Sequence, residues 1–126
     1  MAQGSSSVEE PDSLGLHAVV PLPTCPHLTQ TNDLPESGID ANSVCETCQS
    51  PSEVWVCLTC YKAHCGRYVH GHALIHHLAE QSHAMALSLS DLTVWCYPCE
   101  AYVHNERLIP AKSSAHMSKF GEAMPH

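Results

Sequence analysis

The amino-acid sequence predicts a small α+β domain, with a short antiparallel sheet and one main helix, in which cross-links support a limited apolar core. Three observations lead to this prediction. The chain has 126 residues, the length of one domain with a tail. Leu, Ile, Val and Phe make up about a fifth of it, close to the limit for a self-sufficient core. Cys and His are frequent instead, with 8 and 11 residues.

Local composition predicts the first elements. Residues 1–20 begin with a Ser-, Gly- and acid-rich stretch that has almost nothing to bury, so we expect a disordered tail followed by one domain over 21–126. Prolines favour an extended lead-in at 19–23. The polar stretch 29–42, which contains Pro and Gly, is typical of a long loop.

More strands than helices are expected in the rest of the domain. The run VWVC, with its β-branched and aromatic residues, predicts a strand over 54–57. The stretch 71–81 lacks Pro and is rich in Ala, Leu and His, which predicts one helix of about three turns. Alternation predicts further short strands over 86–89, 94–96 and 101–104, and a terminal helical turn is expected over 111–117.

Charge and hydropathy exclude two kinds of partner. The net charge is −8, and nucleic-acid binding requires Lys and Arg to neutralise phosphates, so we expect no nucleic-acid partner. No run approaches the roughly 18 apolar residues of a membrane span, so we expect no membrane partner. An acidic module is better suited to a basic ligand.

The cysteines are expected to bind metal and not to form disulfides. Residues 1–11 contain no Lys or Arg and no apolar run, so they do not form a signal peptide. Without export the thiols stay reduced, and paired cysteines then indicate metal ligands.

Three Cys-x-x-Cys knuckles carry this signal: Cys45/Cys48, Cys57/Cys60 and Cys96/Cys99. The spacing lets a tight turn direct two thiolates at one tetrahedral ion. One such motif is weak and also occurs in redox proteins, whereas three in a reduced chain are a strong signal. With the other Cys and nearby His they make twelve ligands, enough for three Zn²⁺ ions: Cys25, His27, Cys45, Cys48, Cys57, Cys60, Cys65, His72, His76, His83, Cys96 and Cys99.

Spacing alone leaves the division of these ligands open. In a single-finger partition, His72 and His76 join the Cys57/Cys60 knuckle, as in a Cys2His2 zinc finger, and His83 joins Cys65 and the Cys45/Cys48 knuckle. In a cross-braced partition, His72 goes to the Cys45/Cys48 knuckle, and His76 and His83 go to the Cys57/Cys60 knuckle. His77 adjoins His76 and is an alternative ligand.

Catalysis is not expected within the chain. Catalytic zinc needs an open coordination position, whereas Cys-rich sets of four are closed and structural. No HExxH motif occurs. A zinc deaminase has His-x-Glu before its Pro-Cys-x-x-Cys, but here the segment 104–106 follows Pro98-Cys99. We therefore expect a binding module and not an enzyme.

The chain resembles the ubiquitin-binding zinc finger of the UBP type in five motifs: CPHL, CETC, WVCLTC, CGRYVHGH and WCYPCEAYVH. The resemblance covers residues 21–126. That module occurs in several deubiquitinases and at the C-terminus of the cytoplasmic, tubulin-directed histone deacetylase. The closing KFGEAMPH is most similar to the deacetylase module.

The family implies an α+β fold with three cross-braced zinc ions. Its ligand sets, carried to this chain, are Cys25, His27, Cys96 and Cys99; Cys45, Cys48, Cys65 and His72; and Cys57, Cys60, His76 and His83. One departure concerns the third set. Six residues separate His76 from His83 where the family leads us to expect five, so His77 stays an alternative ligand.

The resemblance also implies a partner, the free Gly-Gly C-terminus of ubiquitin. An Arg fork binds a carboxylate, a Gly lets backbone approach closely, and Trp and Tyr wall a narrow slot. The tail of ubiquitin carries two arginines, which an acidic module attracts. The matching positions are Trp55, Gly66, Arg67, Tyr68, Trp95, Tyr97 and Tyr102.

The resemblance further implies a monomeric accessory domain of a larger deacetylase. The expected location is the cytoplasm, and shuttling to the nucleus is the alternative. An accessory finger of a deubiquitinase and a RING-like ubiquitin-ligase module are the alternatives. A RING places Cys-x-His between its Cys pairs, whereas here Cys25-Pro-His27 comes first, and this order opposes the RING.

Overall fold

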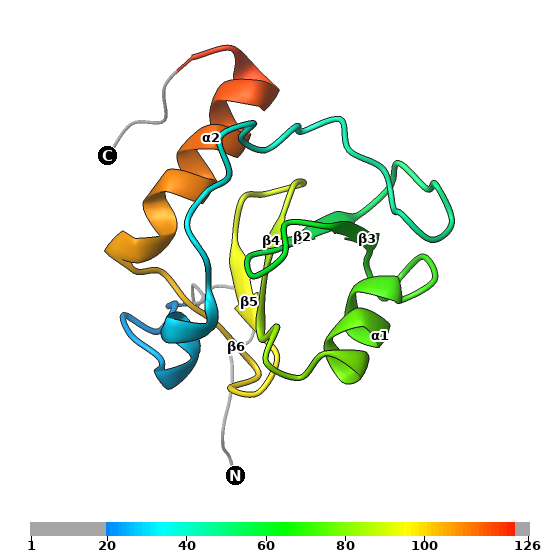
Figure 1. Ribbon diagram of the computed structural model, residues 1–126. Coiled ribbons are helices and arrows are strands. Elements are labelled where there is room, and N and C mark those ends of the chain that lie inside the picture. The colour runs from blue at the N-terminus through cyan, green and yellow to red at the C-terminus, as the bar shows by residue number, and fades with distance from the viewer. Residues whose placement is uncertain (1–19, 123–126) are drawn as a thin grey trace, which may run out of the picture.

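The structure, a computed structural model, describes residues 20–122 (Figure 1). The disordered tail expected over residues 1–20 therefore lies almost entirely outside the described residues, as does the end of the KFGEAMPH motif.

A five-stranded sheet forms the centre of the domain, in the order β3-β2-β4-β5-β6, and all neighbouring strands are antiparallel. This confirms the predicted fold class. The strands are β2 (Val54–Cys57), β3 (Ala63–Cys65), β4 (Met85–Ser88), β5 (Val94–Cys96) and β6 (Ala101–Tyr102).

The expected strands form with small differences. The strand expected over 86–89 begins one residue earlier, and β6 is only two residues long. Val103 instead forms a parallel bridge with Leu22, which ties the extended lead-in to the sheet edge. No strand was expected at β3, because a three-residue segment with a His at its centre shows no alternation.

Two α-helices lie on opposite sides of the sheet (Figure 1). The first, α1 (His72–Ala79), is the helix expected over 71–81, but with eight residues it is about two turns long and not three. The second, α2 (Ile109–Phe120), is three turns long where a single turn was expected. It buries only Ala111, Lys112 and Ala115, so the sequence gives little amphipathic signal for it. Two 3-10 helices, η2 (Pro26–Gln30) and η3 (Glu106–Leu108), were not expected.

The two faces of the sheet differ sharply. The apolar face packs against α2 and η3 in one core, which includes Val54, Val56, Leu87, Val94 and Leu108. Strand register places every second residue on the opposite face, where α1 covers the β3 end of the sheet. That second face carries Trp55, His64, Ala86, Ser88, Trp95 and Tyr102.

Three of the five basic residues attach the C-terminal segment to the body of the domain. Arg107 donates from Nε to the Leu28 carbonyl at 2.9 Å and to Thr31 Oγ1 at 2.8 Å, and from Nη2 to the Thr31 carbonyl at 2.6 Å. Lys119 donates to the Leu89 and Ser90 carbonyls. Lys112 Nζ lies 2.7 Å from His104 Nδ1, and burial lowers the pKa of Lys112.

Removal of the Arg107 contacts should destabilise the domain without affecting its metal content. We expect Arg107→Ala to lower the free energy of unfolding by about 1–3 kcal/mol, since three charge-assisted hydrogen bonds are lost and the carbonyl and hydroxyl oxygens of the buried Thr31 lose their donor. Urea unfolding of the zinc-loaded domain measures this. Lys62→Ala, at an exposed base, is the control and should cost less than about 0.5 kcal/mol. If both variants lowered the free energy of unfolding equally, the Arg107 contacts would not stabilise the domain as proposed.

Candidate metal centres and binding face

The structure brings the twelve candidate ligands together in three clusters, in each of which the donor atoms lie within 4.8 Å of one another. The grouping is that of the cross-braced partition, and the single-finger partition is wrong, because His72 lies away from the Cys57/Cys60 knuckle. We name the clusters site A (Cys25, His27, Cys96, Cys99), site B (Cys45, Cys48, Cys65, His72) and site C (Cys57, Cys60, His76, His83).

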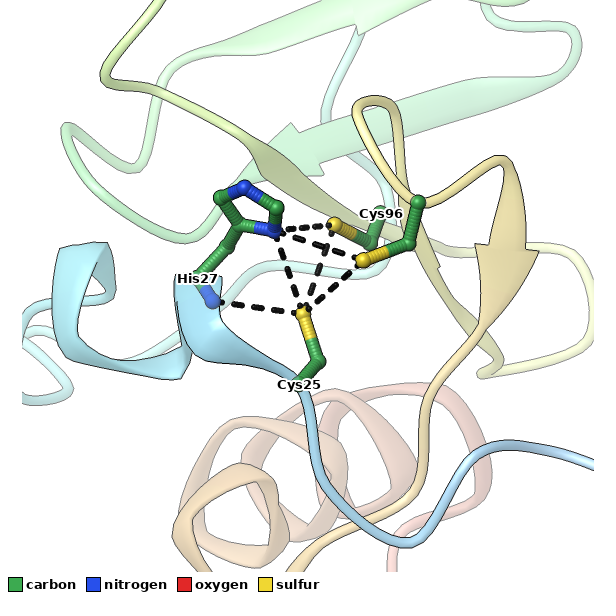
Figure 2. Close-up of side chains that lie close together, drawn as sticks. Cys25, His27 and Cys96 are labelled. Atoms are coloured by element: carbon green, nitrogen blue, oxygen red, sulfur yellow. Dashed lines mark hydrogen bonds between the residues drawn. The ribbon is translucent and has the colours of Figure 1, made fainter.

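Site A joins the start of the described chain to β5 and the turn that follows it. Figure 2 shows Cys25, His27 and Cys96 pointing toward one another from η2 and β5. Cys25 Sγ lies 3.6 Å from Cys96 Sγ and 3.5 Å from Cys99 Sγ. His27 Nδ1 lies 3.3 Å from the sulfurs of Cys25 and Cys96 and 3.4 Å from that of Cys99.

These separations fit a tetrahedral zinc ion. With zinc–sulfur bonds of about 2.3 Å and zinc–nitrogen bonds of about 2.0 Å, a tetrahedron has S–S edges of about 3.8 Å and S–N edges of about 3.5 Å. A disulfide would instead need sulfurs about 2.05 Å apart. All eight cysteines lie within residues 20–122, and all are free thiols.

Site B joins three separate segments: the Cys45/Cys48 knuckle, the end of β3 and the start of α1. His72 Nδ1 lies 3.4 Å from the sulfurs of both Cys45 and Cys65, and the Cys48 and Cys65 sulfurs are 3.9 Å apart. Burial opposes ionisation of Cys45, but hydrogen bonds from backbone N–H groups, first that of Cys48, outweigh it and lower the pKa of the thiol to about 6. The fold thus favours the thiolate of Cys45, the form that binds metal.

Site C lies between β2 and α1. Cys57 Sγ is 3.6 Å from His83 Nδ1, and Cys60 Sγ is 3.4 Å from His76 Nε2. The two ring nitrogens are 3.1 Å apart. The buried ring of His64 stacks on His76 at 4.8 Å, and burial lowers the pKa of both imidazoles. A neutral imidazole is the metal-binding form, so the packing favours ligation.

His77 does not belong to site C. Its Nδ1 lies 3.0 Å from the His83 carbonyl oxygen, and its ring stacks on Tyr97 with centroids 4.8 Å apart and planes at 12°. The additional residue between His76 and His83 therefore does not displace His76 from the cluster.

Each knuckle ends in a strained residue. Gln49, Tyr61 and Glu100 directly follow the second Cys of a knuckle, and their φ angles are 61°, 63° and 50°. The amide N–H of Gln49 donates to the Cys45 carbonyl, and that of Tyr61 donates to the Cys57 carbonyl. Left-handed backbone costs a non-Gly residue about 1–2 kcal/mol. Because this turn aims both sulfurs at one point, metal coordination offsets the cost.

Four of the predicted ligand-binding aromatic residues lie on or beside the second sheet face. Trp55 and Trp95 are half-buried, and Trp95 packs edge-on against Tyr102 with centroids 5.0 Å apart. Tyr97 follows β5, and burial raises its pKa to about 12, so its hydroxyl stays protonated. A Cβ at Gly66 would lie 2.9 Å from Trp55 Nε1, so only glycine fits against the indole there.

Arg67 and Tyr68 lie together on the exposed loop between β3 and α1. Arg67 Nη2 donates to the Tyr68 hydroxyl at 3.1 Å, and the guanidinium lies 5.0 Å from the ring centroid. Within residues 20–122 no carboxylate pairs with Arg67. Unlike the three clamping bases, this guanidinium is available to an external anion.

Over the described range 20–122, neither helix combines the length and the apolar composition that a membrane crossing requires.

Native mass spectrometry should show three zinc ions per chain and eight reduced cysteines. Structural zinc contributes roughly 10–16 kcal/mol of apparent folding free energy in finger peptides, so a strong chelator should unfold this domain. Circular dichroism and NMR dispersion follow the loss. A single bound zinc, a mass lowered by oxidised thiols, or full dispersion after complete metal removal would each contradict the three-site account.

Cadmium NMR should separate the two histidines of α1. We expect His72→Ala to perturb only the cadmium signal that couples to Cys45, Cys48 and Cys65, because His72 belongs to site B. His76→Ala should perturb only the signal that couples to Cys57 and Cys60. Perturbation of one and the same cadmium signal by both variants would restore the single-finger partition.

Comparison with known proteins places these sites in a family. The sequence model of the family described as "Zn-finger in ubiquitin-hydrolases and other protein" matches residues 45–108. Histone deacetylase 6 of Caenorhabditis elegans is 60% identical over 121 residues, which are 96% of this chain and 13% of the deacetylase.

Two further similarities are weaker. Ubiquitin carboxyl-terminal hydrolase 44 of Danio rerio is 45% identical over 49% of this chain and 9% of its own length. The match to the crystal structure of an essential yeast splicing factor has a TM-score of 0.50 and 26% identity. It covers 61% of this chain and 19% of the chain of the splicing factor. The chain thus spans a small part of each of these proteins. Because the family model covers about half of the chain, including sites B and C, the chain belongs to the UBP-type zinc-finger family.

Proposed function

We propose that this domain is a binding module that captures the free Gly-Gly C-terminus of ubiquitin. The observation that carries the proposal is Arg67, an exposed guanidinium without a carboxylate partner in the described part of the chain, directly after a glycine that abuts a tryptophan.

Arg67 is suited to a terminal carboxylate. Its contact with the Tyr68 hydroxyl and ring holds the guanidinium at the surface, which lowers the entropic cost of binding. A guanidinium presents parallel N–H donors that match the two oxygens of a carboxylate. A lysine at this position would keep the charge and lose that fork.

The neighbouring residues favour a ligand without side chains. Gly66 is buried against Trp55, and its amide N–H donates to the Glu53 carbonyl at 2.7 Å. Trp95 and Tyr102 hold each other edge-on on the same face of the sheet as Trp55. Flat aromatic walls with polar edges bind an extended peptide backbone and exclude bulky side chains.

The relatives support a ubiquitin ligand and a larger parent protein. One is named for the ubiquitin carboxyl terminus, and the family description names ubiquitin hydrolases. The chain matches only 13% of the deacetylase relative, so we extend the proposal to an accessory domain of a larger deacetylase. An accessory finger of a deubiquitinase is the alternative. The monomeric state and the cytoplasmic location stay predictions.

Calorimetry with zinc-loaded protein tests tail capture. Loss of one partner of a buried charged hydrogen bond costs about 2–5 kcal/mol, so Arg67→Ala should weaken ubiquitin binding by about thirtyfold or more. Arg67→Lys should fall between Ala and wild type, because it keeps the charge alone. Trp95→Ala should weaken binding comparably to Arg67→Ala. Lys62→Ala, which removes the other exposed base that clamps no backbone, is the control and should bind like wild type.

A second set of titrations varies the ligand and uses ubiquitin whose C-terminus is native, amidated or without its last two glycines. Only the native form should bind well. Equal binding of the truncated form, or wild-type affinity of Arg67→Ala, would contradict the carboxylate pocket and point to the folded surface of ubiquitin.

A further inference from the structure

The adjacent histidines of α1 have different surroundings. His76 lies in site C, whereas His77 faces the third knuckle and stacks on Tyr97. The interplanar angle is 12° and the centroid distance 4.8 Å, an almost parallel stack. Because a carbonyl oxygen only accepts, the 3.0 Å contact with His83 places the proton of His77 on Nδ1. His77 therefore makes one polar contact, with the His83 carbonyl, and one stacking contact, with the Tyr97 ring.

His77 connects two zinc sites. Tyr97 lies inside the Cys96/Cys99 knuckle of site A, and His83 is a donor of site C. The backbone N–H of Tyr97 donates to the carbonyl of Ala84, the residue after His83, at 2.9 Å. The main chain at Tyr97 is thus anchored beside His83, and the stack on His77 adds a contact that fixes the orientation of the largely buried ring.

We infer that His77 is a positioning residue for the captured tail: it binds no zinc, but holds the Tyr97 ring in place by stacking and is itself oriented by the His83 carbonyl. This role presupposes the tail capture proposed above, with Tyr97 as one of the expected slot residues, since it lines the same cavity as Trp55. An ordered aromatic wall binds more tightly than a mobile one, because the entropic cost of ordering is met during folding.

Three substitutions separate the two contacts of His77. His77→Asn keeps a donor for the His83 carbonyl and loses the stack. His77→Phe keeps the stack and loses the donor. His77→Ala loses both. Ile75→Ala is the matched control, since Ile75 is an exposed residue of the same helix at 56% exposure.

Calorimetry against native ubiquitin is read together with the zinc count and the Tyr97 ring signals in NMR spectra. Aromatic stacks have modest energies, so His77→Ala and His77→Asn should weaken binding by about three- to tenfold. His77→Phe and Ile75→Ala should stay within about twofold of wild type. All four variants should retain three zinc ions. The ring signals of Tyr97 in the free protein should move in His77→Ala and stay in Ile75→Ala.

The alternatives give different results. Loss of one zinc ion in His77→Ala would make His77 a ligand and overturn the inference. Wild-type binding by His77→Ala, while Arg67→Ala fails, would overturn the inference and leave tail capture intact. Equal weakening in His77→Phe would contradict stacking as the cause. If wild-type protein binds no ubiquitin, tail capture fails first, and the role of His77 in it fails as well.

Discussion

Tetrahedral coordination by four side chains from distant segments is the constraint on which this fold depends. Site A ties Cys25 and His27 to Cys96 and Cys99, so one ion links the start of the domain to β5 and the turn after it. Sites B and C fix the start and the middle of α1 to the sheet through His72 and His76. The apolar core is thin by comparison, since α2 buries two alanines and a lysine in it. Even the local backbone is shaped for the metal, because each knuckle ends in a left-handed non-Gly residue whose strain is offset by a backbone hydrogen bond within the turn and by coordination.

The same constraint leaves one face of the sheet largely uncovered. Site A and the hydrogen bonds of Arg107, Lys112 and Lys119 hold the N-terminal and C-terminal segments of the domain. The second face of the sheet is covered by α1 only at its β3 end. Trp55, Trp95 and Tyr102 thereby stay half-buried without a covering element, which is unfavourable for a closed core but suits a ligand. Arg67 extends from the loop before α1, whose start is fixed by His72 in site B. The metal sites and the uncovered face are therefore parts of one arrangement, in which His77 contacts both the His83 carbonyl of site C and Tyr97 beside that face.

Much of this arrangement could be predicted from the sequence, for identifiable reasons. Cys-x-x-Cys spacing is set by one turn, so the knuckles and the number of ions followed from local pattern. The partition of His72 and His76 depended on where α1 packs, which no spacing encodes; the family resemblance supplied it. Strand β3 was not predicted because its three residues, AHC, are too few to show alternation. The length of α2 was not predicted because this helix buries only two alanines and a lysine. The role of His77 had no sequence signal at all, since its partner Tyr97 is twenty residues away and its carbonyl acceptor is backbone.

X-ray absorption at the zinc edge of the metal-loaded domain tests the central claim, that three closed tetrahedral sites organise the fold. Eight cysteines and four histidines over three ions predict a mean first shell of sulfur and nitrogen in a ratio of two to one. The shells should lie at about 2.3 Å and 2.0 Å, with four ligands per ion and no oxygen. A shell with water oxygen, five ligands per ion, or equal sulfur and nitrogen would show that at least one site is open or differently built, and would contradict the account.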